Sequence, residues 1–157
     1  MLDKSKYVVV NLGKGGRTML KSGDDPYWKH LGYLEALALK PDIVIIGLGT
    51  NDSKDYQWNE SEYISNYKDM ASTFMSLQSK PRLYFMIPPP IYEDLKFRIQ
   101  ASVVNHKLPF LIPQIAKDIS LPADRIINLF KAFGGVELSR PELLKDNVHP
   151  NDRGYLV

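Results

Sequence analysis

The run IVIIGL at residues 43–48 contains no polar side chain. A strand that faces water on one side alternates apolar and polar residues, whereas a strand covered on both faces reads as a continuous apolar run. This run therefore predicts a strand within a parallel sheet that helices cover on both faces. Lys40-Pro41 precedes the run and ends the helix before it, because the residue before a proline avoids the α-helical region.

Three other short apolar runs predict strands, and the segments between them have apolar residues at helical spacing. The predicted strands span residues 7–12, 43–48, 82–87 and 125–129. The predicted helices span residues 27–39, a segment capped by Asn59 or Ser61 that runs to about residue 78, and residues 99–119, which Pro109 and Pro113 must kink or split. This alternation predicts an α/β fold, in which ligands bind at the carboxyl ends of the strands.

Composition limits the class of protein. The chain has 157 residues, of which 44% are hydrophobic and 24% charged, as in one globular domain with a core. A net charge of +2 is too small to indicate binding to nucleic acid or to an anionic membrane. No apolar run approaches the ~18 residues that span a bilayer. The absence of cysteine excludes disulfides, a cysteine nucleophile and thiolate metal sites. It also fits a reducing compartment, although the localisation stays open, and residues 1–6 carry no signal-peptide pattern.

Three polar clusters follow predicted strands. In the last, KDNVHPNDRGY, Asp146 and His149 are three residues apart, so one helical turn could bring the carboxylate to the imidazole ring. An aspartate bonded to one ring nitrogen fixes the tautomer and leaves the other nitrogen as a base. The alternative for this motif alone is a surface turn with a solvated histidine.

The other two clusters also have structural alternatives. The glycine-rich turn in NLGKGGRT can bring backbone N–H groups close to a ligand, but it lacks the residue order of a P-loop. By itself it could be a structural turn. Asn51, in GTND, could likewise be a turn former whose side chain bonds its own backbone.

Taken together, the three clusters resemble the SGNH (GDSL-like) hydrolases, a family named for functional Ser, Gly, Asn and His residues. NLGKGGRT matches the glycine block at Gly16, GTND matches the asparagine block at Asn51, and DNVHP matches the last block at Asp146 and His149. The order and spacing fit across nearly the whole chain. Residues 24–54 look closest to the sialate O-acetylesterase or carbohydrate acetylesterase branch.

The resemblance implies a flavodoxin-like three-layer α/β/α fold with a parallel sheet, and ester hydrolysis by serine-type acyl transfer. The Gly16 N–H and the Asn51 amide would stabilise the oxyanion, and His149 would be the base that Asp146 orients. Asp52 would brace the loop rather than react. We expect a small-molecule ester substrate, with an acetylated sugar as the leading candidate, and no cofactor, metal, nucleic acid or membrane span. The oligomeric state stays open.

The Gly-Asp-Ser block of the family is not in this sequence. A strand, a crossover helix and the next strand take ~30 residues, so a serine preceding the strand at residues 7–12 should lie upstream of Met1. Ser22 follows the wrong strand, and Ser53 is too close to Asn51 for nucleophile and oxyanion donor to lie on opposite sides of a carbonyl. With Val157 early in the expected closing helix, we interpret residues 1–157 as a single, incomplete hydrolase domain that is inactive as given.

Two alternatives remain: a non-catalytic fragment or pseudoenzyme that binds a ligand or partner through the same pocket, and a flavodoxin-like phosphate binder that uses residues 13–18. If the first strand is missing, residues 7–12 and 43–48 should be separated by a strand-wide gap or should pair directly. Three aromatic residues near the expected site could stack on sugar rings or serve packing: Tyr27, Trp28 and Trp58. His30 and His106 have no partner at ligand spacing, so packing or surface roles are expected.

Overall fold

The structure, a computed structural model, describes residues 5–92, 96–136 and 140–157. Its centre is a three-stranded parallel sheet in the order β1-β2-β3. The strands are β1 (Ile43–Ile46), β2 (Arg82–Ile87) and β3 (Ile126–Asn128). In the register of the sheet, Ile46 of β1 lies beside Phe85 of β2, which in turn lies beside Ile126 of β3. The apolar runs therefore predicted a parallel α/β sheet correctly, with β1 and β3 each shorter than expected by two residues.

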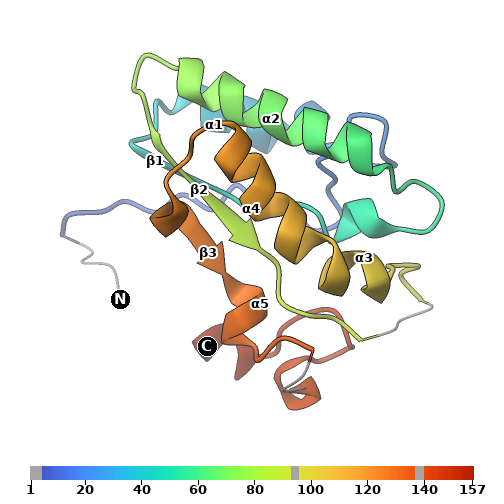
Figure 1. Cartoon of the computed structure of the whole chain (residues 1–157). Coiled ribbons are helices and arrows are strands. Elements are labelled where there is room, and N and C mark those ends of the chain that lie inside the picture. The colour runs from blue at the N-terminus through green and yellow to red at the C-terminus, as the bar shows by residue number, and fades with distance from the viewer. Residues whose placement is uncertain (1–4, 93–95, 137–139) are drawn as a thin grey trace.

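Five α-helices accompany this sheet: α1 (Leu31–Ala38), α2 (Glu60–Ser76), α3 (Ala101–His106), α4 (Leu108–Asp118) and α5 (Leu129–Ala132). Short 3-10 turns complete the described elements: η1 (Tyr27–Lys29), η2 (Asn51–Ser53), η3 (Ala123–Arg125), η4 (Pro141–Leu143) and η5 (Gly154–Leu156). Figure 1 shows α2 and α4 side by side, with the red C-terminal segment beyond the carboxyl ends of β2 and β3. Within the described residues, no helix is both long enough and apolar enough to cross a membrane.

Local signals account for several helix boundaries. The Asn59 side chain caps α2 by accepting a hydrogen bond from the Glu62 N–H at 3.1 Å, so of the two predicted caps Asn59 is the correct one. The predicted helix at residues 99–119 splits at Lys107 into α3 and α4, as its prolines required. Pro109 lies in the first turn of α4, where a missing N–H costs nothing, whereas Pro113 is accommodated inside the helix.

The core joins α2 to the sheet through buried aromatic rings. Tyr67 and Phe85 meet edge to face with their centroids 4.7 Å apart, and both are fully buried. The Tyr67 hydroxyl donates to the Ile46 carbonyl at 3.2 Å, and the Tyr63 hydroxyl donates to the Leu48 carbonyl at 2.9 Å. These bonds satisfy carbonyl groups at the end of β1 and fix the point where the chain leaves the sheet.

The strand predicted at residues 7–12 is wrong. These residues form no strand, and Val8 and Val9 are 93% and 74% exposed. β1 is consequently an edge of the sheet, and Ile45 is 53% exposed although both faces of this strand were expected to be covered. A strand depends on hydrogen bonds to a neighbour, and β-branched composition alone does not supply them. The direct pairing that we considered for residues 7–12 and 43–48 is not formed, and no additional central strand occurs among the described residues.

The helix predicted at residues 27–39 is interrupted at His30. His30 has an extended backbone, and its Nδ1 accepts a hydrogen bond from the Gly32 N–H at 3.0 Å, which caps α1. The residues before it form η1 instead of a first helical turn. His30 therefore has a structural role, in line with the packing or surface role expected for it.

Candidate active site

Three loops from distant parts of the sequence meet around one pocket of about 710 Å³. Gly16, Asn51 and His149 all line it, as predicted, although the strand expected before Gly16 is not formed. A volume of this size lies within the usual range for small-molecule sites. The residues that the sequence motifs identified are thus brought together, and their catalytic roles stay predictions.

Asn51 is placed by a sharp turn at the end of β1. Gly49 has a φ of +145°, and a Cβ at this position would lie 2.7 Å from the Tyr63 hydroxyl and 2.9 Å from the Leu108 Cδ1. Only glycine fits there, so the chain can turn directly into η2. The Asn51 carbonyl accepts from the Gln57 side chain at 2.7 Å. The Asn51 amide makes no hydrogen bond within residues 5–92, 96–136 and 140–157, so it is available to a ligand.

Gly16 has a φ of +83°, in the left-handed region that favours glycine. Its N–H has no acceptor in the described part of the chain. An unpaired backbone N–H beside an unpaired carboxamide is the arrangement that stabilises a developing oxyanion.

Asp52 connects the loops that carry these two donors. Its fully buried carboxylate accepts from the Met19 N–H at 3.0 Å and from the Leu20 N–H at 2.7 Å. Burial raises the pKa of this carboxyl from 3.8 to about 6, against the opposing effect of the two backbone hydrogen bonds. Asp52 is therefore a brace between the glycine and asparagine loops, as the sequence analysis proposed.

Asp146 and His149 form a pair within one tight turn. Asn147 has a φ of +64°, a conformation that asparagine tolerates, and this turn brings His149 Nδ1 to 2.9 and 3.0 Å from the two Asp146 carboxylate oxygens. The His149 backbone N–H also donates to Asp146 at 2.8 Å, and it is the main reason that the pKa of Asp146 lies below its usual value. With Nδ1 directed at the carboxylate, Nε2 is the nitrogen left for a substrate.

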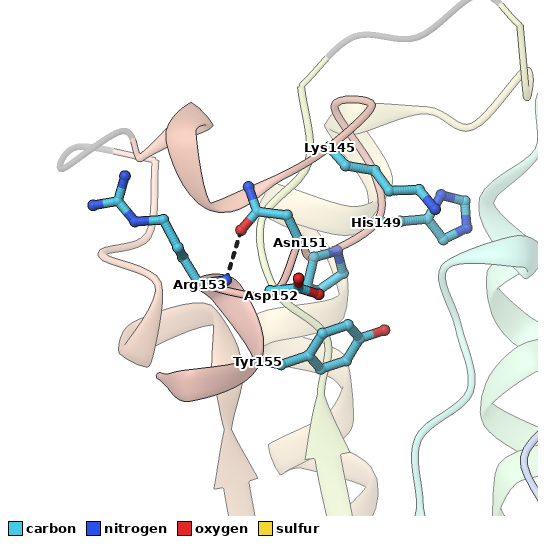
Figure 2. Close-up of a pocket in the computed structure, with 7 residues that line it drawn as sticks. Lys145, His149, Asn151, Asp152, Arg153 and Tyr155 are labelled. Atoms are coloured by element: carbon cyan, nitrogen blue, oxygen red, sulfur yellow. Dashed lines mark hydrogen bonds between the residues drawn. The ribbon is translucent and has the colours of Figure 1, made fainter.

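The surroundings of His149 are partly open. Its side chain is 54% exposed, and the Phe97 ring packs against it edge to face with centroids 5.4 Å apart. A second pocket of about 580 Å³ adjoins the histidine. Figure 2 shows Lys145, His149 and Tyr155 extending to one side of this second pocket, while Asn151 bonds the Arg153 backbone N–H at 3.0 Å.

Among the described residues, no serine lines the larger pocket. The Ser22 hydroxyl donates to Glu62 at 2.8 Å. Ser53 is fully buried, and its hydroxyl donates to the Thr50 carbonyl at 2.8 Å. Both hydroxyls are engaged in structural bonds, so the structure offers neither as a nucleophile beside His149.

The aromatic residues of the pocket differ from the three that the sequence suggested. Tyr27 donates its hydroxyl to the Leu12 carbonyl at 2.9 Å, Trp28 donates to the Met19 carbonyl at 2.7 Å, and Trp58 packs on Tyr63 with centroids 5.3 Å apart. None of the three lines the pocket, so their packing alternative is correct. The aromatic side chains that do line it were not identified from sequence: Tyr56, Phe97, Phe133 and Tyr155. For Tyr56 a signal existed, since it lies five residues after Asn51 in the same loop.

Charged groups around the pocket give no sign of a metal centre. Among the residues that the structure describes, no group of three or more His, Asp or Glu side chains could hold a metal ion. The charged side chains that line the pocket are Lys54, Lys96 and Arg98, and His149 adds an imidazole. The same pocket contains a histidine paired with a carboxylate and two unpaired N–H donors, groups that acyl transfer uses.

Several known proteins are similar to this chain in sequence or in fold. A model of the GDSL-like Lipase/Acylhydrolase family matches residues 2–157. An acetylxylan esterase from Xylanibacter ruminicola is 28% identical over 166 residues, which cover 94% of this chain and 33% of that protein. The chain thus spans about one third of the length of that relative.

Solved structures show the same fold. An acetyl xylan esterase superposes with a TM-score of 0.65 at 21% identity, over 90% of this chain and 72% of the other. A GDSL-like lipase from Bacteroides thetaiotaomicron gives 0.61 at 26% identity, over 80% and 62%. A catalytic serine-to-alanine mutant of an acetylxylan esterase from Geobacillus stearothermophilus gives 0.58 at 20% identity, over 90% and 64%. With a family model that matches residues 2–157, the chain belongs to the GDSL-like lipase/acylhydrolase family.

Proposed function

We propose that this chain supplies the oxyanion site and the base of a serine esterase that removes acetyl groups from carbohydrate. The observation that carries the proposal is the shared pocket of Gly16, Asn51 and His149, with Asp146 on the far nitrogen of the imidazole. These are the groups that acyl transfer needs apart from its nucleophile.

In the proposed reaction, the nucleophile is a serine from outside residues 1–157, which are an incomplete part of the domain. Its oxygen attacks the carbonyl carbon of the ester while its proton passes to His149 Nε2. The negative oxygen that forms is bound by the Gly16 N–H and the Asn51 amide. The bond between the carbonyl carbon and the sugar oxygen then breaks, and His149 gives the proton to that oxygen, which leaves as the sugar hydroxyl. Water attacks the remaining acetyl-serine ester in the same way, with its proton passing through His149 to the serine oxygen, so that acetate and the free serine are released.

The serine and the substrate class draw support from similar proteins. One similar solved structure is of a catalytic mutant in which alanine replaces serine, and that protein and the Xylanibacter relative are acetylxylan esterases. A carbohydrate acetyl ester is therefore our candidate substrate. Asp146 would hold the imidazole in the tautomer that leaves Nε2 unprotonated.

The activity test uses a longer chain that reads upstream of Met1 in the natural gene and includes an in-frame Gly-Asp-Ser block. We expect it to hydrolyse p-nitrophenyl acetate, and His149→Ala to lower kcat/KM by about 10³-fold or more. His106→Ala is the matched control, because His106 is exposed in α3 and does not line the pocket. Unchanged turnover in His149→Ala would remove His149 from the mechanism.

The second candidate is a protein that binds a ligand through the same pocket without catalysis. The absence of any serine among the described pocket-lining residues favours it. A natural gene with no Gly-Asp-Ser block upstream, together with saturable ligand binding by the 157-residue chain, would support this candidate over the esterase.

A further inference from the structure

Tyr56 is an exposed aromatic residue in the wall of the pocket. It follows Asn51 by five residues, lines the same pocket of about 710 Å³, and is 50% exposed. A half-exposed tyrosine beside an unpaired amide is well placed to contact the part of a substrate that flanks the reacting ester.

The Tyr56 ring is held in one orientation by groups from three loops. Its hydroxyl donates to Asp24 Oδ2 at 2.7 Å, and the Lys54 ammonium donates to the same oxygen at 2.5 Å. The Arg98 guanidinium lies over the ring, 4.7 Å from the centroid, and pairs with Asp55 at 2.8 Å. The hydrogen bond to Asp24 is the main cause of a raised Tyr56 pKa, so the phenol stays protonated and keeps donating.

This anchoring has a consequence for binding. A side chain that is already fixed loses little conformational entropy when a ligand packs on it, so its contact surface contributes more fully to affinity. Arg98 lies over one face of the ring and the side chain is still 50% exposed, so a ligand would contact the face opposite Arg98. A flat apolar face with charged groups at its edge matches a pyranose ring, which presents C–H groups on its faces and hydroxyl groups around its edge.

We propose that Tyr56 forms a sugar-binding subsite next to Asn51, where its free face stacks on a pyranose ring of the carbohydrate that carries the acetyl ester. The proposal rests on the proposed function for its substrate class, and it assigns to Tyr56 the recognition of the sugar, leaving the acetyl group to the oxyanion site. The anchoring residues Asp24, Lys54 and Arg98 act by holding the ring.

The test is a titration of the 157-residue chain with xylotetraose, in which NMR shifts of the backbone amides measure binding. We expect saturable shifts at residues 50–57, and a three- to tenfold weaker Kd in Tyr56→Leu, the range expected for loss of one aromatic stacking contact. Tyr56→Phe keeps the ring but loses the hydrogen bond to Asp24, so its Kd should lie between those of the original chain and Tyr56→Leu. Tyr7→Leu is the matched control, because Tyr7 is 41% exposed and does not line the pocket.

Equal affinity in Tyr56→Leu and the original chain, or no binding of xylotetraose, would overturn the subsite.

A second measurement separates the subsite from the proposed function. In the longer, active chain, Tyr56→Leu should raise KM for acetylated xylo-oligosaccharide by a larger factor than KM for p-nitrophenyl acetate, because that ester has no sugar. Equal losses on both substrates would mean that Tyr56 acts through Asn51, which overturns the subsite. Tyr56-dependent sugar binding in a longer chain without esterase activity would overturn the proposed function and uphold the subsite.

Discussion

Around the pocket, polar side chains of neighbouring loops hold one another in place, whereas along the outer side of β1 apolar side chains lie exposed. Asp52 joins the glycine loop to the asparagine loop, and Gln100 donates to the Ser53 carbonyl at 3.0 Å from the loop before α3. On the edge strand β1, Ile45 is 53% exposed, and in α1 Leu31 and Leu34 are 77% and 57% exposed. The pocket is thus organised by hydrogen bonds between residues of this chain, while β1 and α1 leave apolar side chains exposed to solvent.

The contrast separates two requirements of the site. Hydrogen bonds within the loops orient the proposed oxyanion donors, and these bonds need only residues that are present here. The support that a sheet gives to its strands depends on a neighbour on each side, and β1 has a neighbour only in β2 among the described residues. An unpaired apolar edge is a recognised site for adding another strand or for aggregation.

The largest expected effect is a difference in unfolding free energy between alanine substitutions of two adjacent isoleucines that lie on opposite faces of β1. Ile46 is 4% exposed and Ile45 is 53% exposed. Ile46→Ala should lower the free energy of unfolding by about 2–5 kcal/mol, because it removes buried methyl groups and leaves a cavity. Ile45→Ala in the same chain should cost less than about 1 kcal/mol. Urea denaturation of both variants measures the difference.

The same pair can sharpen the comparison in the longer chain. If upstream residues cover β1, the cost of Ile45→Ala should rise toward that of Ile46→Ala. Equal costs for the two substitutions already in the 157-residue chain would show that the outer face of β1 is buried in solution, contrary to the exposure described here.

A smaller effect is expected from Asp52, the buried carboxyl group that joins the two loops of the pocket: it should make the free energy of unfolding depend on pH. The pKa of Asp52 is about 6 in the folded chain against an ordinary value of 3.8, so the folded state binds this proton more tightly than the unfolded state. The contribution of Asp52 to the free energy of unfolding should therefore fall as pH rises from about 4 to about 6, by on the order of 3 kcal/mol, and stay constant above about 7.

Urea denaturation at several pH values between 4 and 8 tests this, with Asp52→Asn as the comparison. Asparagine does not titrate, so the difference in unfolding free energy between the two chains isolates Asp52 from exposed carboxylates such as Asp146, whose pKa is lowered. A difference that does not change with pH would mean that Asp52 is ionised throughout this range, with its two backbone hydrogen bonds outweighing the cost of burial.

The features predicted correctly from the sequence are those that local chemistry decides. The strand at residues 82–87 and the cap at Asn59 follow from an apolar run and from capping chemistry. The predicted convergence of Gly16, Asn51 and His149 is also correct, although the strand from which it was argued for Gly16 is not formed. The family-level assignment followed from three short motifs in the right order.

The failures concern features that distant contacts decide. Residues 7–12 have strand composition but no strand to pair with. Trp28 turns inward because the Met19 carbonyl accepts its indole N–H, a contact that no local pattern encodes. Tyr56 faces the pocket because Asp24 and Arg98 hold it there, and both come from other loops.

The smallest expected effect is the change in unfolding free energy when either of two asparagines, Asn59 or Asn51, is replaced by alanine. Asn59 caps α2 through its side chain, so Asn59→Ala should lower the free energy of unfolding by about 1 kcal/mol. The Asn51 amide has no hydrogen-bond partner within the described residues, so Asn51→Ala should change stability by less than about 0.5 kcal/mol. In the longer, active chain the order reverses: Asn51→Ala should lower kcat by about 10²–10³-fold as an oxyanion donor, while Asn59→Ala leaves kcat unchanged. Thermal unfolding and p-nitrophenyl acetate kinetics on both variants provide the comparison, and a loss of stability in Asn51→Ala as large as in Asn59→Ala would assign Asn51 to the structure of the turn.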